Sequence, residues 1–396
     1  MSAPLKGIKI LDLTHMVAGP YGTMILADLG AEIIKIEPPL KGEITRGLLK
    51  DDPENSVDGV GAYHLTLGRN KKSLTLDLKS APGLNVFYEL VKRADVVIDN
   101  FSMGVTKRLK IDFETLKKHN AKIISCSISG FGESDLDRPA YDNIIQGYSG
   151  LMSVTGMDSE NPVKLGTPIA DLSTGLFAMI GILSSLRNRD NSGEGEQVDI
   201  SMMDCQVSLL NYMATMHLIS GKNPEPIGNK HVLHTPFNSY KTNDGFITIS
   251  VVHEHFWPNL LKALDLPSLD IEKYKTAPGR FEDRAKIDQV LADMLIKNST
   301  KHWLKLLQEN RVPCGPVNKF SDAFEDPDLI KRDMIVEVEQ ASGAKVKMPG
   351  NPIKLSNSSS EYQSAPTLGE HSAEILKEWL GMTDDQISEL KEENII

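Results

Sequence analysis

Asp171 is the residue whose setting best suits nucleophilic chemistry. It follows the irregular segment 166–170 and opens a nearly all-apolar stretch, residues 171–187, that is predicted to be a buried helix. An aspartate at a helix start has two interpretations. It caps the helix by accepting hydrogen bonds from free backbone N–H groups. Alternatively, because this position keeps the side chain ionised, it attacks an electrophile as a carboxylate.

Two further segments carry residues that suit an anionic or aromatic ligand. The run 69–73 (RNKKS) precedes an alternating strand and is either a solvated turn or a phosphate-recognition element. Residues 99–101 (DNF) follow a predicted strand, at the edge where α/β proteins bind ligands. There Phe101 suits stacking on adenine and Arg108 suits a phosphate, although an ordinary strand-to-helix turn has the same composition.

Three smaller patterns have weaker chemical meaning. Tyr141, in segment 138–143 (RPAYDN), either orients an acyl group or is an ordinary tyrosine at the start of a helix. His253 and His255 have no third ligand near them in the sequence, so no metal site is expected. The run 193–196 (GEGE) carries two acids that would repel phosphate, and it is predicted to be a turn.

The elements that must position these residues alternate between strand and helix. Apolar strands are predicted at 8–13, 32–37, 95–99 and 122–128, with helical patterns between them. This alternation predicts an α/β fold with a parallel sheet. No Gly-x-Gly-x-x-Gly follows the first strand, so a usual dinucleotide site is not expected. The predicted division is a large domain over 1–220, a linker over 221–236, a small domain over 237–325, and a return segment with C-terminal helices over 326–396 that would pack on the large domain.

Composition narrows the class of protein. The chain has 396 residues, 40% hydrophobic and 24% charged, as in an ordinary globular protein. Its formal net charge of -11 argues against a nucleic-acid partner or an anionic membrane surface. The 3 cysteines are too few for a disulfide framework. The N-terminal residues lack a signal-peptide pattern and no stretch approaches about eighteen apolar residues, so a cytoplasmic protein without a membrane span is expected.

Taken together, these segments resemble the class III CoA-transferases, the family that includes formyl-CoA:oxalate transferase, carnitine CoA-transferase and the bile-acid-inducible F type. The resemblance covers almost the whole chain, and the order and spacing of its parts are more specific than any one part. The segments that carry it are 5–14 (LKGIKILDLT), 18–20 (AGP), 26–37 (LADLGAEIIKIE), 69–73, 99–101, 130–132 (GFG), Asp171 and 195–202 (GEQVDISM).

The resemblance implies a large Rossmann-like domain, a smaller α+β domain and an interlocked homodimer. Its active site would lie between the large domain of one subunit and the small domain of the other. It also implies that Asp171 forms an anhydride and then an aspartyl-CoA thioester. The substrates would be an acyl-CoA thioester and a free carboxylic acid, with no permanently bound cofactor.

The resemblance also assigns binding residues. Several positions fall where the family contacts CoA, and one falls at the acyl-site tyrosine. Overall similarity favours the transferases that use a dicarboxylic acid such as succinate, glutarate or itaconate, and two further side chains either meet the far carboxylate of such an acid or support the fold. The CoA contacts are Val17, Ala18, Leu76, Lys79, Asn100, Phe101 and Arg108, with the first two at the pantetheine end; the tyrosine is Tyr141; the carboxylate contacts are His15 and Arg46.

Two departures from the family pattern bear on the substrate. Formyl-CoA transferases carry a glutamine where this chain has Val17, and the glycine-rich flap of that group is not found between 240 and 275, so formyl-CoA:oxalate transfer is not expected. The related α-methylacyl-CoA racemases carry a histidine in place of Tyr141, and a tyrosine has the wrong pKa for removing an α-proton. Racemisation is the first alternative function, and non-catalytic binding of acyl-CoA is the second.

Overall fold

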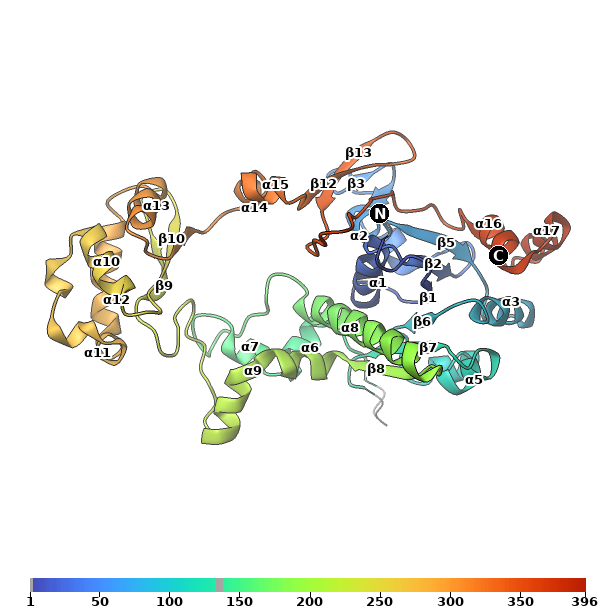
Figure 1. Cartoon of the computed structure of the whole chain (residues 1–396), viewed down its shortest axis with the longest axis horizontal. Helices are drawn as coiled ribbons and strands as arrows, with labels where there is room; N and C mark the ends of the chain where they lie inside the picture. The colour runs from blue at the N-terminus through green and yellow to red at the C-terminus, as the bar shows by residue number, and fades with distance from the viewer. Residues whose placement is uncertain (1–2, 133–137) are drawn as a thin grey trace. The chain divides into compact units, whose positions relative to one another are not determined.

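The computed structural model describes residues 3–132 and 138–396, which divide into two compact units. Unit 1 contains the chain up to Leu151, Lys164–Lys222 and Ile330–Ile396, and unit 2 contains Met152–Val163 and Asn223–Leu329. The segment Met152–Val163 thus belongs with unit 2, although the sequence pattern had placed it in the large domain. The chain leaves unit 1 and returns to it, as Figure 1 shows by colour.

Unit 1 is built on a six-stranded parallel sheet with the order β5-β2-β1-β6-β7-β8. If its strands are numbered in chain order, the sheet has the 3-2-1-4-5-6 order of a doubly wound fold. The α/β fold with a parallel sheet is the one predicted from the sequence. The strand order reverses between β1 and β6, which is where such folds bind ligands. The strands are β1 Lys9–Asp12, β2 Glu32–Glu37, β5 Lys71–Thr75, β6 Val96–Asp99, β7 Ile124–Ser129 and β8 Gln197–Ser201.

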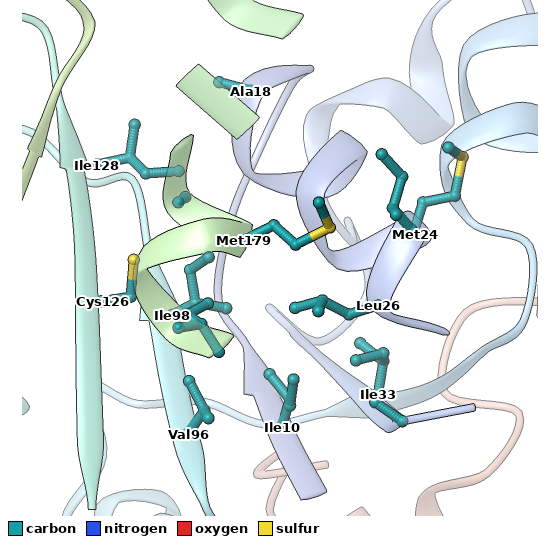
Figure 2. Packing of buried hydrophobic residues seen from close by; sticks show 14 of the residues in the cluster. Ile10, Ala18, Met24, Leu26, Ile33, Val96, Ile98, Cys126, Ile128 and Met179 are labelled. Atoms are coloured by element: carbon teal, nitrogen blue, oxygen red, sulfur yellow. The ribbon is translucent and has the colours of Figure 1, made fainter. Parts of the chain in front are cut away.

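Alternating side chains of these strands form two separate cores. Ile10 faces one cluster, with α1 and α8, and Leu11 faces the other, with α3, α5, α16 and α17. Figure 2 shows the first cluster, where Met179 of α8 lies over Val96, Ile98 and other strand residues. The helices are α1 Ala18–Asp28, α3 Ala81–Val91, α5 Phe113–His119, α6 Asp142–Tyr148, α8 Ile169–Ser192, α9 Met202–Ser220, α16 Ser372–Leu380 and α17 Asp384–Glu392.

The connection 38–68 between β2 and β5 is partly folded, and the return segment adds a hairpin. The shorter elements of this unit are η1 Ile44–Gly47, β3 Ser56–Val57, β4 Val60–Gly61, α2 Ala62–Leu67, α4 Val105–Leu109, β12 Ile335–Glu339 and β13 Lys345–Pro349. The strands β12 and β13 pair antiparallel.

Helix α8 crosses α1 at two glycines. A Cβ on Gly22 would lie 2.6 Å from the carbonyl oxygen of Gly175, and a Cβ on Gly175 would collide with the carbonyl oxygen of Ala18. This close approach sets the first turn of α8, with Asp171, beside the start of α1. By length and composition α8 would suffice to cross a membrane, contrary to the expectation from the sequence, but half of its apolar window is buried, as in a core helix.

Unit 2 contains a hairpin of β9 and β10, extended by a third antiparallel strand, β11. Helices α10, α12 and α13 contribute to the core of this small sheet through Trp257, Ile287 and Trp303. Two short helices, α7 Leu151–Val154 and α15 Pro327–Lys331, lie across the boundaries between the units. The other elements of unit 2 are β9 Phe237–Lys241, β10 Phe246–Ser250, α10 Phe256–Leu264, η2 Pro267–Leu269, η3 Glu272–Lys275, α11 Ala277–Glu282, α12 Arg284–Leu295, α13 Thr300–Glu309, β11 Cys314–Pro316 and α14 Phe320–Phe324.

Candidate active site

A cavity of about 390 Å³ opens at the switch point of the parallel sheet. Its walls come from the segments after β1, β6 and β7, from the approach to α6, and from the first turn of α8. The residues singled out from the sequence that line it are His15, Ala18, Asn100, Phe101, Tyr141 and Asp171. These residues are far apart in the chain, and the fold brings them to one cavity.

Asp171 lies in the first turn of α8 but does not cap the helix. The cap comes from Asp142 of α6, whose Oδ1 accepts hydrogen bonds from the backbone N–H of Ala170 at 2.8 Å and of Asp171 at 3.4 Å. Within the described ranges, the Asp171 carboxylate has neither a hydrogen bond nor an ion pair. Burial raises the pKa of Asp171 to about 6, and the nearby Asp142 carboxylate adds to the rise. Asp171 is therefore a more basic carboxylate than an exposed aspartate, and its oxygens are available to a ligand.

His15 is held in the cavity wall by Asn100. The backbone N–H of His15 donates to Asn100 Oδ1 at 2.8 Å, and Asn100 Nδ2 donates to the His15 carbonyl oxygen at 2.7 Å. The His15 ring leans on Phe101, with ring centroids 5.7 Å apart. Burial lowers the pKa of His15, and the Lys35 ammonium lowers it further, so the imidazole is neutral near pH 7. The two side-chain groups of Asn100 are thus engaged with this loop.

The other predicted CoA contacts lie outside this cavity. Leu76 is 1% exposed and belongs to the second core, whereas Lys79 beyond β5 and Arg108 in α4 are exposed. Val17 is the N-cap residue of α1 and packs against the first core, next to the cavity-lining Ala18. A second cavity of about 280 Å³ shares Phe101 with the first.

Arg46 lines a different, very small cavity of about 10 Å³ with Lys35, His64 and Lys71. Its Nε and Nη2 donate to the two carboxylate oxygens of Glu37 at 2.6 and 2.7 Å. Burial alone would raise the pKa of Glu37, but this bidentate pair, with further help from Ser73, lowers it to about 2. The structure does not bring Arg46 together with Asp171.

The basic run 69–73 is neither a surface turn nor a ready phosphate site. Arg69 is buried and pairs with Asp28 at 2.6 Å, and Lys71 is buried and pairs with Asp12 at 3.1 Å. Of the two lysines in this run, Lys72 alone is partly exposed. Both interpretations from the sequence were wrong for Arg69 and Lys71, because Lys71 begins the buried strand β5 and Arg69 is buried against Asp28.

Two residues of the site were missed. Asp142 belongs to the segment that the sequence singled out for Tyr141, yet no local pattern connects it with the start of α8. Arg138 of the same segment also lines the cavity; its guanidinium lies 4.2 Å from the ring centroid of Phe131 and 5.4 Å from that of Tyr148. The run Arg138-Pro139 marks a turn before a helix, but it does not reveal these contacts.

Comparison with known proteins gives one consistent result. The model of "CoA-transferase family III" matches residues 5–372. Succinyl-CoA:glutarate CoA-transferase of Homo sapiens is 34% identical over 397 residues, covering 99% of this chain and 90% of that protein. Succinyl-CoA:mesaconate CoA-transferase of Haloarcula hispanica is 35% identical over 382 residues, covering 94% of this chain and 96% of that protein.

A solved structure agrees with this result. The crystal structure of a CAIB/BAIF family protein from Brucella suis superposes with a TM-score of 0.85 at 33% identity, covering 96% of this chain and 100% of that one. The match to the family model spans most of the chain, including both compact units. The resemblance identified from the sequence segments is confirmed, and the chain belongs to CoA-transferase family III.

Proposed function

We propose that this chain transfers CoA from an acyl-CoA thioester to a dicarboxylic acid through covalent intermediates on Asp171. One observation carries the mechanism: a basic, unpaired Asp171 carboxylate at the wall of the large cavity. The substrate class rests on relatives that are named for succinyl-CoA with glutarate or mesaconate, at 34% and 35% identity.

In the first half of the reaction, an Asp171 oxygen attacks the thioester carbonyl of the donor. The C–S bond breaks, CoA leaves as a thiolate, and Asp171 becomes one side of a mixed anhydride. The thiolate then attacks the Asp171 carbonyl carbon. The anhydride C–O bond breaks, the donor leaves as a carboxylate, and Asp171 holds CoA as a thioester.

In the second half, the acceptor carboxylate attacks the Asp171 thioester and displaces the thiolate. The thiolate then attacks the acyl carbon that came from the acceptor. The new acyl-CoA leaves, and the Asp171 carboxylate is restored. Every intermediate is an activated acyl group, so no ATP is required, but water must be kept out because it would hydrolyse each of them.

The environment of Asp171 suits both halves of the transfer reaction. A pKa of about 6 makes the carboxylate a stronger nucleophile than an exposed aspartate while leaving it mostly ionised at neutral pH. Asp142 accepts the hydrogen bonds of the first backbone N–H groups of α8, so these N–H groups do not bind the Asp171 oxygens. The capping residue therefore both orients the turn and keeps the nucleophile unpaired.

CoA would extend from Asp171 toward the residues that the family uses. Ala18 lines the cavity and Val17 precedes it, which suits the pantetheine end, and Phe101 offers an aromatic face. Exposed Lys79 and Arg108 would meet phosphates. Leu76 would contribute apolar support from beneath, and Tyr141, which is 65% exposed, would contact the acyl group from the cavity rim.

We further propose that the chain works as an interlocked homodimer in the cytoplasm. Exposed apolar side chains gather on the outer faces of α8 and α9, and a second subunit would cover them. They are Leu176, Ile180, Val207, Leu209, Tyr212, Met216, Leu218 and Ile219. Sedimentation or light scattering should then give twice the mass of one chain.

The decisive test is to trap the intermediate. The protein is incubated with succinyl-CoA, treated with hydroxylamine, digested, and examined by mass spectrometry. We expect a hydroxamate on the peptide containing Asp171, and none on a sample incubated with free CoA. A label on another residue would refute the assignment. Tight acyl-CoA binding with no label and no exchange would favour a binding protein, and deuterium uptake at the α-carbon of a branched acyl-CoA without an acceptor would favour a racemase.

A further inference from the structure

A dicarboxylic acid carries a second carboxylate that the transfer chemistry does not use. When the first carboxylate reacts at Asp171, the second must stay in the cavity or at its rim. A carboxylate taken out of water needs a paired cation or several hydrogen bonds. The proposed function, on which this inference rests, therefore calls for a cation, or several hydrogen-bond donors, in the same cavity as the nucleophile.

Arg138 is the one lysine or arginine among the described residues that line this cavity. His15 lines it too, but its lowered pKa makes it a neutral partner that can supply a hydrogen bond and no charge. Arg46 lies in the small cavity, bound to Glu37 through both carboxylate oxygens. We propose that Arg138 binds the far carboxylate of the dicarboxylic acid and so selects dicarboxylates over monocarboxylates.

The guanidinium of Arg138 is prepared for such a partner. Its central carbon lies over the rings of Phe131 and Tyr148, and these cation–π contacts use none of its N–H groups. Over 3–132 and 138–396 no acidic side chain pairs with it. A carboxylate can then meet the free edge of the guanidinium in the bidentate geometry that arginine favours over lysine.

The position of Arg138 in the chain places it near the nucleophile. Four residues further on, Asp142 is bonded to the backbone N–H groups of Ala170 and Asp171. A segment this short cannot carry Arg138 far from the first turn of α8, since each residue spans at most about 3.5 Å. Lys79 and Arg108, the expected phosphate contacts, lie on separate segments and do not line this cavity. Arg138 is thus on the acyl side of the cavity.

The test compares two acids of equal carbon number, glutarate and pentanoate, as acceptors from succinyl-CoA. In a ping-pong reaction, kcat/KM for the acceptor reports its binding to the aspartyl-CoA form and the steps of that half-reaction, so a defect toward the donor does not disturb it. For Arg138→Gln we expect kcat/KM for glutarate to fall about 10- to 100-fold and that for pentanoate to change less than about threefold. Arg138→Lys should recover part of the loss.

The controls distinguish binding of the far carboxylate from binding of a CoA phosphate and from support of the fold. Arg93→Gln removes an exposed arginine of the same unit that lies outside the cavity, and it should leave both acids unchanged. The Kd of free CoA, measured by calorimetry, should be the same for Arg138→Gln and the wild type. A weakened Kd would mean that Arg138 holds a CoA phosphate, and an equal fall for both acids would mean a structural role; either result overturns the proposal.

Failure of the proposed function and failure of the Arg138 role give different results. A wild-type protein that transfers CoA to no acid refutes the proposed function itself. A wild type that uses glutarate, beside an Arg138→Gln variant that uses it equally well, refutes only the role of Arg138. If the wild type does not turn over pentanoate, the loss on glutarate, its partial recovery in Arg138→Lys and the unchanged Kd of CoA together decide the question.

Discussion

Asp12 and Asp171 are both aspartates near the carboxyl edge of the parallel sheet, and the fold treats them in opposite ways. Burial by itself would raise the pKa of each. At Asp12 the ammonium groups of Lys35 and Lys71, at 3.2 and 3.1 Å, overcome burial and hold the pKa far below its usual range. At Asp171 no such cation is found among residues 3–132 and 138–396, and the pKa rises to about 6. Countercharges, more than burial, decide which aspartate is structural and which is reactive.

The structural aspartate supports the reactive site. Asp12 Oδ1 accepts from the backbone N–H of Thr14 at 2.8 Å, and Lys35 contacts both Asp12 and the Thr14 carbonyl oxygen. This network fixes the segment after β1, which presents His15 to the cavity. The cations of the interior hold the loop, while the cavity keeps its nucleophile unpaired.

The largest effect is expected from removing the reactive carboxylate. Asp171→Asn keeps the shape but cannot form the anhydride, so transfer should fall by about 10³-fold or more. Transfer of labelled CoA from succinyl-CoA to glutarate measures this activity. Asp190→Asn, at the exposed far end of the same helix, should retain wild-type activity. Substantial exchange in Asp171→Asn would remove the contrast with Asp12, because the unpaired carboxylate would then have no chemical role.

The next effect concerns stability. Lys71→Met leaves Asp12 with one of its two lysines, and removing one partner of a buried pair costs about 3–5 kcal/mol of the free energy of unfolding. Denaturant unfolding should show this loss. Lys72→Met, one residue along β5, breaks half-exposed pairs with Glu32 and Glu374 and should cost less than about 1 kcal/mol. Equal losses would show that burial of the ion pair does not matter.

The pH dependence of the rate sharpens the contrast. Protonated Asp171 is not a nucleophile, so kcat/KM should fall as the pH drops below about 6. Asp142→Asn keeps an oxygen for the helix cap but removes the charge that raises the pKa of Asp171. The acid limb should therefore move to lower pH, by less than about one unit. A limb that moves upward, or one that lies near pH 4 in the wild type, would contradict the assigned environment.

The smallest expected effect is on how the free energy of unfolding depends on pH. A carboxylate with a raised pKa and one with a lowered pKa change this free energy in opposite directions. The folded-state pKa of Asp171 is raised, so its cost to stability is full above about pH 6 and is relieved as the pH falls toward about 4. Asp171→Asn should be more stable than the wild type at pH 7.5 by about 1–2 kcal/mol, and the difference should vanish near pH 4. Glu37, whose pKa is lowered to about 2, contributes stability that is lost only below its unfolded pKa. Calorimetric melting of both proteins across this range would show the trend.

Much of the fold of unit 1 followed from local patterns. The apolar run 8–13 predicted β1, which spans Lys9–Asp12, and the apolar stretch from 171 predicted α8, which spans Ile169–Ser192. These predictions hold because hydrophobic periodicity and turn residues act over a few neighbours. The third strand of unit 2, β11, was not predicted: it has three residues, and it pairs with β10 from a distant part of the chain.

The site residues likewise divide into those that local sequence patterns predicted and those that depend on distant contacts. Strand ends and a helix start drew attention to Asn100, Phe101 and Asp171, and all three line one cavity. The prediction for the basic run 69–73 was wrong, because its burial depends on acids at Asp12 and Asp28 that are distant in the chain. The roles of Asp142 and Arg138 were missed for the same reason.

By itself the sequence determined the order of strands and helices, the family, and the aspartate at the head of α8. Only the tertiary structure decided which charged side chains are paired and which are free. Local patterns report the secondary structure that a chain prefers over a few residues. The pKa of a carboxylate, and whether it is paired, depend on groups that folding brings within a few ångströms. That is why Asp12 and Asp171 look alike in the sequence and differ in the folded protein.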